Sequence, residues 1–425
     1  MQAYLSACEI YIRMFSKISV LFVGLSVCLA CKNEPEKEVV ATAEVENTPL
    51  HTIENPTLGN SSLPRLFTDG EQLHMSWVQR QDSLATLFYA TYNKGQWTEA
   101  EAINSGTDWF VNWADFPALA VNKSGVLTNF LQKSANGTYT YDVKLNLYNA
   151  AEKTWKKNFI LHDDGTQSEH GFVSMRSYVD DSFLVVWLDG RETAGHDHGG
   201  GQMTLRAAIV FKDGSIQYDT LLDERVCDCC QTSVAIGTND EIVVAYRDRS
   251  EDEIRDISVV RWQQEGGWSK PMTVGQDNWK IPGCPVNGPS IDAFENNMVV
   301  AWFTGAKEEG DVQVAFSEDN GTTFGSAFRI DVGDATGRVD VVMLSEEEAA
   351  VLWLEPKGDA TVIQLMKINK NGYTEPAVTI AETSPERSTG FPQLEVVGDR
   401  AYIAWTSVTG KEAIINTASI ALKDF

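Results

Sequence analysis

The stretch VVWLDG at residues 185–190 decides the fold, because segments of this kind return along the chain at nearly constant spacing. Each copy is a short apolar strand that ends around a large residue, and these residues lie 51 to 59 positions apart. A repeat of this length, built of short strands, is typical of a β-propeller, whose blades bury their faces only by packing in a ring. Seven copies therefore predict an all-β, seven-bladed propeller. The copies are MSWVQ (75–79), LTNFLQ (127–132), VVWLDG (185–190), VVAYRD (243–248), VVAWFTG (299–305), AVLWLE (350–355) and YIAWTS (402–407).

The two ends of the ring are expected to meet. Each unit reads as an inner strand, the large-residue strand, a third strand and an outer strand, but the last unit stops after its third strand at TASIAL (417–422). The stretch PLHTIE (49–54) is placed to supply the missing outer strand. Such a pairing of the chain ends would leave no exposed edge in the ring.

The N-terminal region predicts export. Residues 14–31 (MFSKISVLFVGLSVCLAC) hold one lysine, an apolar run and a small residue before Cys31, which is the pattern of a secretory signal. The segment resembles a bacterial lipoprotein signal, in which Cys31 would carry the lipid, and an ordinary cleaved signal peptide stays open as the alternative. We therefore expect a signal at 1–30, an acidic tether at 31–55 and the propeller at 56–425. The expected location is the cell envelope, as an outer-membrane lipoprotein that contacts the membrane through its lipid alone.

The charge of the chain excludes some partners. The formal net charge is −26, and it becomes −27 without residues 1–30, which hold Arg13, Lys17 and Glu9. Such a surface repels nucleic acid and anionic lipid. An anionic sugar would need a local basic pocket to overcome the same repulsion.

One loop carries a resemblance to a known family. SEDNGTTF (317–324) matches the Asp-box pattern S-x-D-x-G-x-T-W, with Phe324 in place of the tryptophan, and the chain thereby resembles the sialidase superfamily of BNR-repeat propellers. We expect Asp319 to cap backbone amides of this turn and Gly321 to take a positive φ, so Asp319 is structural. The resemblance implies a glycan-active propeller similar to an exo-α-sialidase. That family is typically six-bladed, so a six-bladed ring is the alternative fold.

The unusual residues of the chain are expected on one face of the ring. In a propeller, the links into the inner strands and the loops between second and third strands open on the same face, over the central channel, and sites lie in such loops. The links hold Arg65, Asp115, Glu169, His170, residues 226–231, residues 284–289, Arg338 and Arg387, and the loops are 189–201 and 247–256.

The cysteines allow three interpretations. Four of them in an exported protein favour two disulfides. Thiolates together with nearby imidazoles would instead form a soft ligand set for copper or zinc, and free thiols are the third alternative. The candidate ligands are Cys227, Cys229, Cys230, Cys284, His196 and His198.

The arginines and acids supply candidates for catalysis. The resemblance to sialidases implies clustered arginines that bind a substrate carboxylate through paired hydrogen bonds, together with a tyrosine nucleophile and an aspartate acid or base. Tyr246 is expected to be a packing residue. The alternative for 247–256 is a solvated, salt-bridged loop. The candidates are Asp189, Arg191, Arg247, Arg249, Arg255, Arg338, Arg387 and Asp115, with Asp248 and Asp256 as further acids or bases.

The aromatic segment DWFVNWADFP (108–117) offers rings that could stack on a sugar. We expect Phe116 in the core and Trp109 or Trp113 at the rim, and we add His170 and Asn287 as substrate-binding candidates.

These observations favour an exported, lipid-anchored propeller that handles a glycan, as a sialidase-like glycoside hydrolase. The alternative, from another class, is a non-catalytic propeller whose Cys/His face binds a metal or a partner.

Overall fold

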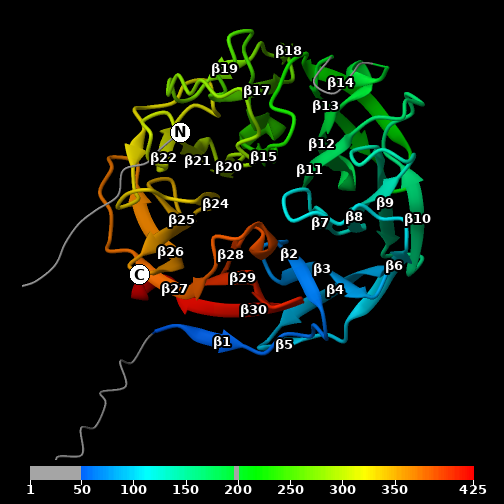
Figure 1. Ribbon diagram of the computed structural model, residues 1–425, viewed down its shortest axis with the longest axis horizontal. Coiled ribbons are helices and arrows are strands. Elements are labelled where there is room, and N and C mark those ends of the chain that lie inside the picture. The colour runs from blue at the N-terminus through cyan, green and yellow to red at the C-terminus, as the bar shows by residue number, and fades with distance from the viewer. Residues whose placement is uncertain (1–48, 196–200) are drawn as a thin grey trace, which may run out of the picture. The chain divides into compact units, whose positions relative to one another are not determined.

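The computed structural model describes residues 49–195 and 201–425, and in these residues the chain is all-β apart from short 3-10 turns. Seven antiparallel sheets stand around a central axis as the blades of a propeller (Figure 1). The seven-bladed prediction is confirmed, and the six-bladed alternative is wrong. Cys31, the expected signal, most of the expected tether, His196 and His198 lie outside the described residues.

Each of the first four blades is continuous in the sequence, with its first strand innermost. Blade 1 holds β2 (Ser61–Thr68), β3 (Leu73–Gln81), β4 (Leu84–Asn93), β5 (Gln96–Trp97) and β6 (Glu101–Gly106). Blade 2 holds β7 (Leu119–Asn122), β8 (Gly125–Lys133), β9 (Tyr141–Asn149) and β10 (Thr154–Ile160). Blade 3 holds β11 (His170–Ser177), β12 (Phe183–Asp189), β13 (Thr204–Val210) and β14 (Ile216–Asp223). Blade 4 holds β15 (Ser233–Ile236), β16 (Ile242–Arg247), β17 (Ile257–Gln263), β18 (Gly267–Trp268) and β19 (Met272–Thr273).

The last three blades follow the same order, except that blade 7 takes its outer strand from the start of the chain. Blade 5 holds β20 (Ser290–Phe294), β21 (Asn297–Thr304), β22 (Asp311–Ser317) and β23 (Phe328–Arg329). Blade 6 holds β24 (Gly337–Met343), β25 (Glu348–Lys357), β26 (Ala360–Asn369) and β27 (Val378–Thr383). Blade 7 holds β28 (Gln393–Val397), β29 (Arg400–Thr409), β30 (Glu412–Ala421) and β1 (His51–Ile53). The 3-10 turns are η1 (Val179–Asp181), η2 (Arg191–Thr193), η3 (Thr238–Asp240), η4 (Arg387–Thr389) and η5 (Leu422–Asp424).

The ring closes by pairing its two ends, as predicted. Strand β1 runs antiparallel to β30, with His51 opposite Ser419 and Ile53 opposite Thr417 (Figure 1). The Asn55 amide extends this contact by donating to the carbonyl of Ile415 at 2.9 Å. Because β1 belongs to blade 7, the propeller begins before residue 51 rather than at residue 56.

The repeated large residues form the core between blades. Trp77, Trp187, Trp302 and Trp353 are each at most 1% exposed, and burial of such a side chain stabilises the fold by about 1.5–3 kcal/mol. Blade 2 has Asn129 at the same place, and its Oδ1 accepts a hydrogen bond from the Ala118 amide at 2.7 Å. The polar residue is thus paired with backbone inside the core.

The Asp-box loop is a turn between β22 and β23. Asp319 Oδ1 accepts hydrogen bonds from the Thr323 amide and the Ser317 hydroxyl, both at 2.8 Å, and Gly321 has φ +69°. Asp319 therefore caps this turn, as its sequence context predicts.

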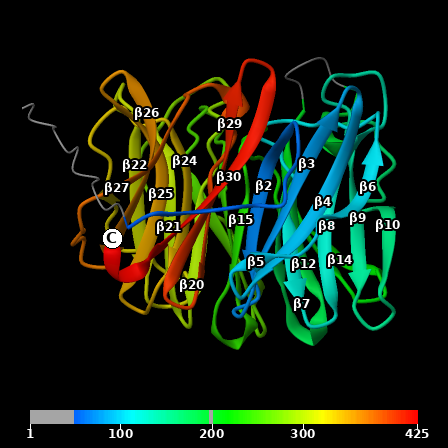
Figure 2. The ribbon, with the colours of Figure 1, turned by 90° about the horizontal axis from the view of Figure 1, so that it is seen from below.

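Seen from the side, the strands of the blades run between two faces at which the loops turn (Figure 2). We call the face that carries the links into the inner strands the upper face. Within the described ranges, no helix is long and apolar enough to cross a bilayer.

Candidate functional site

The upper face brings together loops from separate blades. The Gly190 amide donates to the Glu169 carbonyl at 2.8 Å, and the Cys227 amide donates to the Arg247 carbonyl at 3.0 Å. On the far side of the ring, the Thr336 amide donates to the Leu354 carbonyl at 2.9 Å. In each case a link into an inner strand pairs with the second strand of its own blade or with the residue that follows that strand. The links and loops expected on one face therefore share that face.

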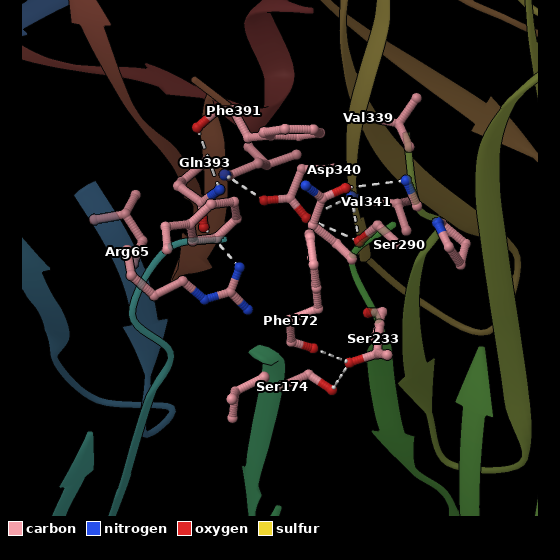
Figure 3. A pocket seen from close by; sticks show the side chains of 18 of the residues that line it. Arg65, Phe172, Ser174, Ser233, Ser290, Val339, Asp340, Val341, Phe391 and Gln393 are labelled. Atoms are coloured by element: carbon pink, nitrogen blue, oxygen red, sulfur yellow. Dashed lines mark hydrogen bonds between the residues drawn. The ribbon is translucent and has the colours of Figure 1, made fainter. Parts of the chain in front are cut away.

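The central channel is narrow and polar. Its cavity is about 60 Å³, and Figure 3 shows Arg65 and Asp340 among the side chains that line it. Arg65 Nη1 donates to Gln393 Oε1 at 2.7 Å, and Asp340 accepts from the Ser290 hydroxyl and the Leu394 amide at 2.9 Å each. Ligand pockets commonly measure about 300–1,000 Å³, so this channel has room for a few waters but not for a sugar ring.

A tyrosine and two acids meet at the upper face, next to Ala114, Phe116 and Phe172, which line the channel, and we call Asp115, Tyr141 and Glu169 the proton-sharing group. The Tyr141 hydroxyl lies 3.0 Å from Asp115 Oδ2 and 2.7 Å from Glu169 Oε1. Because a phenol has one hydrogen to donate, both contacts are hydrogen bonds only if one carboxyl is itself protonated. The three residues therefore hold an acid proton between them.

The backbone fixes this group in place. The Phe172 amide donates to Asp115 Oδ1 at 2.7 Å, and the Phe110 ring stacks on Tyr141 with centroids 4.3 Å apart. Residue 171 must be glycine, because a Cβ there would collide with the Asp115 carboxylate. The link before β7, the start of β9 and the link before β11 each contribute one member of the group.

Burial tunes the acids of this group. It raises the pKa of Asp115 to about 7 and the pKa of Glu169 to about 8, and it raises the pKa of Tyr141 well above the usual value for a phenol. Asp115 and Tyr141 are buried, whereas Glu169 is half-buried. Glu169 is thus the member with exposed surface, and a pKa of about 8 keeps it protonated at neutral pH.

A second carboxylate near Glu169 lies beside two arginines, and burial raises its pKa as well. Asp228 lies 3.1 Å from Arg249 Nη1 and 3.8 Å from Arg255 Nη1, and its charge contributes to the raised pKa of Glu169. Glu253 binds the same two arginines, at 2.7 Å and 2.8 Å. The loop 247–256 is therefore salt-bridged, as one of the two interpretations of its sequence predicted, and its arginines hold Asp228 on the upper face.

The cysteines also converge here. Sγ of Cys227 lies 2.7 Å from Sγ of Cys230 and 3.9 Å from Sγ of Cys229, and the four cysteines of the described residues are free thiols. A hydrogen bond with Cys229 lowers the pKa of Cys284 to about 7. Burial alone would raise the pKa of Cys227, but hydrogen bonds with Cys229 and Cys230 and the charge of Arg255 hold it well below the usual value. The expected disulfides are not present in the structure.

Arg247 and Arg338 do not have the geometry of a carboxylate clamp. The Arg247 guanidinium donates to the carbonyls of Asn287, Arg255 and Phe303 at 2.6–2.9 Å. Arg338 donates to four oxygens of residues 385–390, one of them the Thr389 hydroxyl, at 2.7–3.1 Å. Both side chains are buried, so the role expected for them is corrected to tying blades together.

Asp189, Arg191 and His170 form a separate buried set. Arg191 binds Asp189 through two hydrogen bonds of 2.8 Å, and Trp187 Nε1 donates to the same carboxylate at 2.8 Å. Asp189 is fully buried and occupied, which removes it as a free acid or base. His170 is also fully buried and stacks on His162 with centroids 3.6 Å apart, so it does not face a substrate.

The aromatic candidates divide between core and rim. Trp109 stacks on Phe130 at 4.1 Å and is 9% exposed, so it packs in the core and the rim expectation for it is wrong. Trp113 is half-buried, and the guanidinium groups of Arg338 and the exposed Arg387 lie 5.0 Å and 5.9 Å from its ring.

Three further candidates are also structural. Asn287 accepts from the Arg338 amide at 2.7 Å and is 8% exposed, so it links blades instead of binding substrate. Asp256 accepts from the Trp279 amide at 2.9 Å, and Asp248 accepts from the Ser258 hydroxyl at 3.0 Å.

Sequence reasoning missed several members of the site. Tyr141 begins the third strand of blade 2, and no local pattern distinguishes it from a packing tyrosine. Asp228 stands between two cysteines, which drew the interpretation toward thiols. The sequence showed Glu169 as an acid in a link into an inner strand. Its contact with Tyr141 is visible only in the structure.

Comparisons with known proteins address the fold. No protein-family profile and no curated protein matches the sequence. Among solved structures, an ulvan lyase described as a new family of polysaccharide lyase matches with a TM-score of 0.56 and 10% identity, over 87% of this chain and 96% of that one. The fold is shared. NanB sialidase from Streptococcus pneumoniae gives 0.43 and 9% over 88% and 94% of the two chains, and an α-L-arabinanase from Penicillium chrysogenum gives 0.46 and 10% over 88% and 99%.

Proposed function

We propose that this protein is a glycan-active enzyme in which Glu169 is the proton donor. The observation that carries the proposal is a half-buried acid, hydrogen-bonded to a buried tyrosine, with its pKa raised to about 8. Enzymes that cleave glycosidic bonds need a carboxylic acid that stays protonated at neutral pH, so that it can protonate the leaving oxygen. Tyr141 and Asp115 hold Glu169 in position and share its proton.

Asp228 is the partner that this chemistry requires. Two guanidinium groups face its carboxylate and favour the ionised form, against a burial that raises its pKa overall. One acid kept neutral by burial and one carboxylate beside arginines is the division of roles expected of a general acid and a base or nucleophile.

The ulvan lyase likeness supports a polysaccharide as substrate, because that protein has the same ring and is described as a polysaccharide lyase. A lyase removes a proton beside a uronate carboxyl and leaves a double bond, whereas a hydrolase adds water across the glycosidic bond. Either reaction needs a proton donor at the leaving oxygen. The products therefore distinguish the two reactions.

An exo-sialidase reaction is the finer function implied by the sequence. It needs arginine side chains that are free to bind a carboxylate in a bidentate manner. Backbone and hydroxyl oxygens occupy the Arg247 and Arg338 guanidiniums, and Arg191 and Arg249 are bound to acids, so we expect no hydrolysis of a fluorogenic sialoside.

The test is a screen of neutral, uronate-containing and sialylated glycans with the purified protein. Reducing ends report cleavage, and ultraviolet absorbance of an unsaturated product reports a lyase. Glu169→Gln should lower kcat by about 10²–10⁴-fold, the usual contribution of a general acid. Glu251→Gln, an exposed carboxylate on the same face, is the matched control and should keep full activity. Equal activity of the Glu169→Gln variant and wild type would remove the proposal.

We also propose that Cys31 carries a lipid and anchors the protein in the cell envelope. The segment 14–31 supports this, since it has the order of a lipoprotein signal. Cys31→Ser should move the protein from the detergent phase to the aqueous phase in a phase-separation assay, with Cys28→Ser as control. Detergent partitioning of both variants alike would contradict the anchor.

A further inference from the structure

Three thiols that the proposed chemistry does not use lie at the same rim. We call Cys227, Cys229 and Cys230 the thiol cluster, whose Sγ atoms all lie within 4.8 Å of one another. Cys227 is 1% exposed and Cys230 is 2% exposed, while Cys229 is half-buried. The cluster therefore has two sulfurs inside the fold and one that opens to solvent.

The backbone holds the cluster rigidly. Before it, the Val226 amide donates to the Met203 carbonyl at 2.9 Å, and the Cys227 amide donates to the Arg247 carbonyl at 3.0 Å. After it, Gln231 Nε2 donates to the Ala114 carbonyl at 2.6 Å. These bonds fasten both ends of the four-residue segment to other blades. A short loop fixed at both ends is preorganised to bind a ligand without further ordering.

Two guanidiniums lie near the sulfurs. Arg255 Nη1 lies 3.4 Å from Sγ of Cys227, and the charge of Arg247 acts on Cys230. Arg247 gives all its hydrogen bonds to carbonyls, so no acid neutralises it. Arg255 also binds Glu253 at 2.8 Å and lies 3.8 Å from Asp228, so of these two guanidiniums only Arg247 is without an acid partner among the described residues.

The ligand that fits this site is a soft metal ion. Thiolates select Cu(I) or Zn(II), but structural zinc takes four protein ligands in a tetrahedron. The group of mutually close ligand atoms here holds three sulfurs, and exposed Cys284 is outside it. We infer that Cys227, Cys229 and Cys230 form a three-coordinate site for one Cu(I) ion at the upper rim of the propeller.

This site does not depend on the proposed glycan chemistry. Glu169 and Asp228 act through oxygen, and neither belongs to the set of three sulfurs. The competing state is a Cys227–Cys230 disulfide, which would remove two of the three ligands. The experiment must therefore count thiols as well as metal.

The test uses the full chain, reduced and kept free of oxygen, with Cu(I) supplied against bicinchoninate as the competing chelator. We expect one Cu(I) per chain, and an X-ray absorption spectrum with sulfur as the nearest scatterer. Cys229→Ser changes the half-buried ligand and leaves the two buried sulfurs in the fold. It should weaken Cu(I) binding by more than about tenfold, since even changes to outer-shell partners of metal ligands cost about 10–100-fold in affinity.

Cys284→Ser is the matched control and should bind Cu(I) as wild type does. Three results would overturn the inference. They are Cu(I) uptake that Cys229→Ser leaves unchanged, preferential uptake of Zn(II) with loss in Cys284→Ser, and a Cys227–Cys230 disulfide that reductant cannot open in the folded protein. Circular dichroism of each variant shows whether a loss of binding reflects a loss of fold.

Discussion

At the scale of single residues, the site depends on which side chains share a proton. Tyr141 contacts two carboxyls and is itself inaccessible, so it acts on chemistry through Glu169. Its hydrogen bond favours the ionised form of Glu169, while burial and the charge of Asp115 favour the neutral form. The pKa of Glu169 is thus set by a balance of opposing effects that one substitution can shift.

Tyr141→Phe tests this balance. Loss of the phenol removes a hydrogen bond that lowers the pKa of Glu169, so the pKa should rise above its value of about 8. Because the proposed donor must be protonated, the alkaline limb of kcat/KM should move to higher pH. Tyr139→Phe, at an exposed tyrosine, should leave the pH profile as it is. An alkaline limb in the same place in both variants would mean that Glu169 does not control it.

Arg338→Met tests the assignment of this arginine as a structural tie. Four oxygens would lose their donor inside the ring, and we expect a loss of about 2–4 kcal/mol in the free energy of unfolding. Arg387→Met removes an exposed guanidinium and should change stability by less than about 0.5 kcal/mol. Urea titration measures both. Equal stability of the two variants would return Arg338 to the arginines that could bind a substrate carboxylate.

The sequence pattern predicts where residues lie around the ring but not where their side chains point. Arg247 and Arg255 lie on the predicted face, yet one binds carbonyls and the other binds Glu253 and a thiol. Loop position follows from strand order, whereas the partner of a guanidinium depends on contacts between blades that are far apart in sequence. Arg338 adds a bulge in β24, where its φ is +53°, and no local pattern marks it.

At the scale of elements, strand periodicity made the fold predictable. A large residue on each second strand must be buried between blades, so seven such strands specify seven interfaces. The periodicity did not predict the register of the inner strands. β2, β11 and β24 all shift register near their first residues, at Leu63, Phe172 and Arg338, which have positive φ. Bulges of this kind re-aim side chains and depend on the neighbouring strand.

The closing strand gives a prediction at this scale. A chain truncated before residue 49 keeps β1, and a chain truncated before residue 55 loses it together with its pairing to β30. The shorter chain should be less stable by about 2–4 kcal/mol, from three residues of ladder and the newly exposed edge. It should also associate through that edge, which light scattering detects. Equal urea midpoints for the two truncations would show that closure does not depend on β1.

At the scale of the whole molecule, the ring buries acids more often than it neutralises them. Asp115, Glu169 and Glu395 lie in three different blade junctions or inner strands, and burial raises their pKa values to about 7, 8 and 8. Their ordinary values are 3.8, 4.5 and 4.5. The folded protein therefore binds protons that the unfolded chain releases.

The consequence is a pH dependence of stability with a defined sign. A carboxyl whose pKa is raised by folding contributes its full stability below its unfolded pKa and loses it as pH rises through the folded pKa. Three such groups weaken the fold between about pH 4 and pH 8. His162 acts in the other direction, because burial lowers its pKa from 6.5 to about 4, and its contribution is lost as pH falls through that range. The lowered pKa values of His74, Cys227 and Cys284 act in the same direction as that of His162. The carboxyls with raised pKa values outnumber these four groups, since Asp223, Asp292 and Asp340 are among them, so the thermal midpoint should be higher at pH 5 than at pH 8. Asp115→Asn should flatten this difference, whereas Asp108→Asn, on the same link, should leave it intact. A midpoint that rises from pH 5 to pH 8 would show that these acids are not buried in the folded ring.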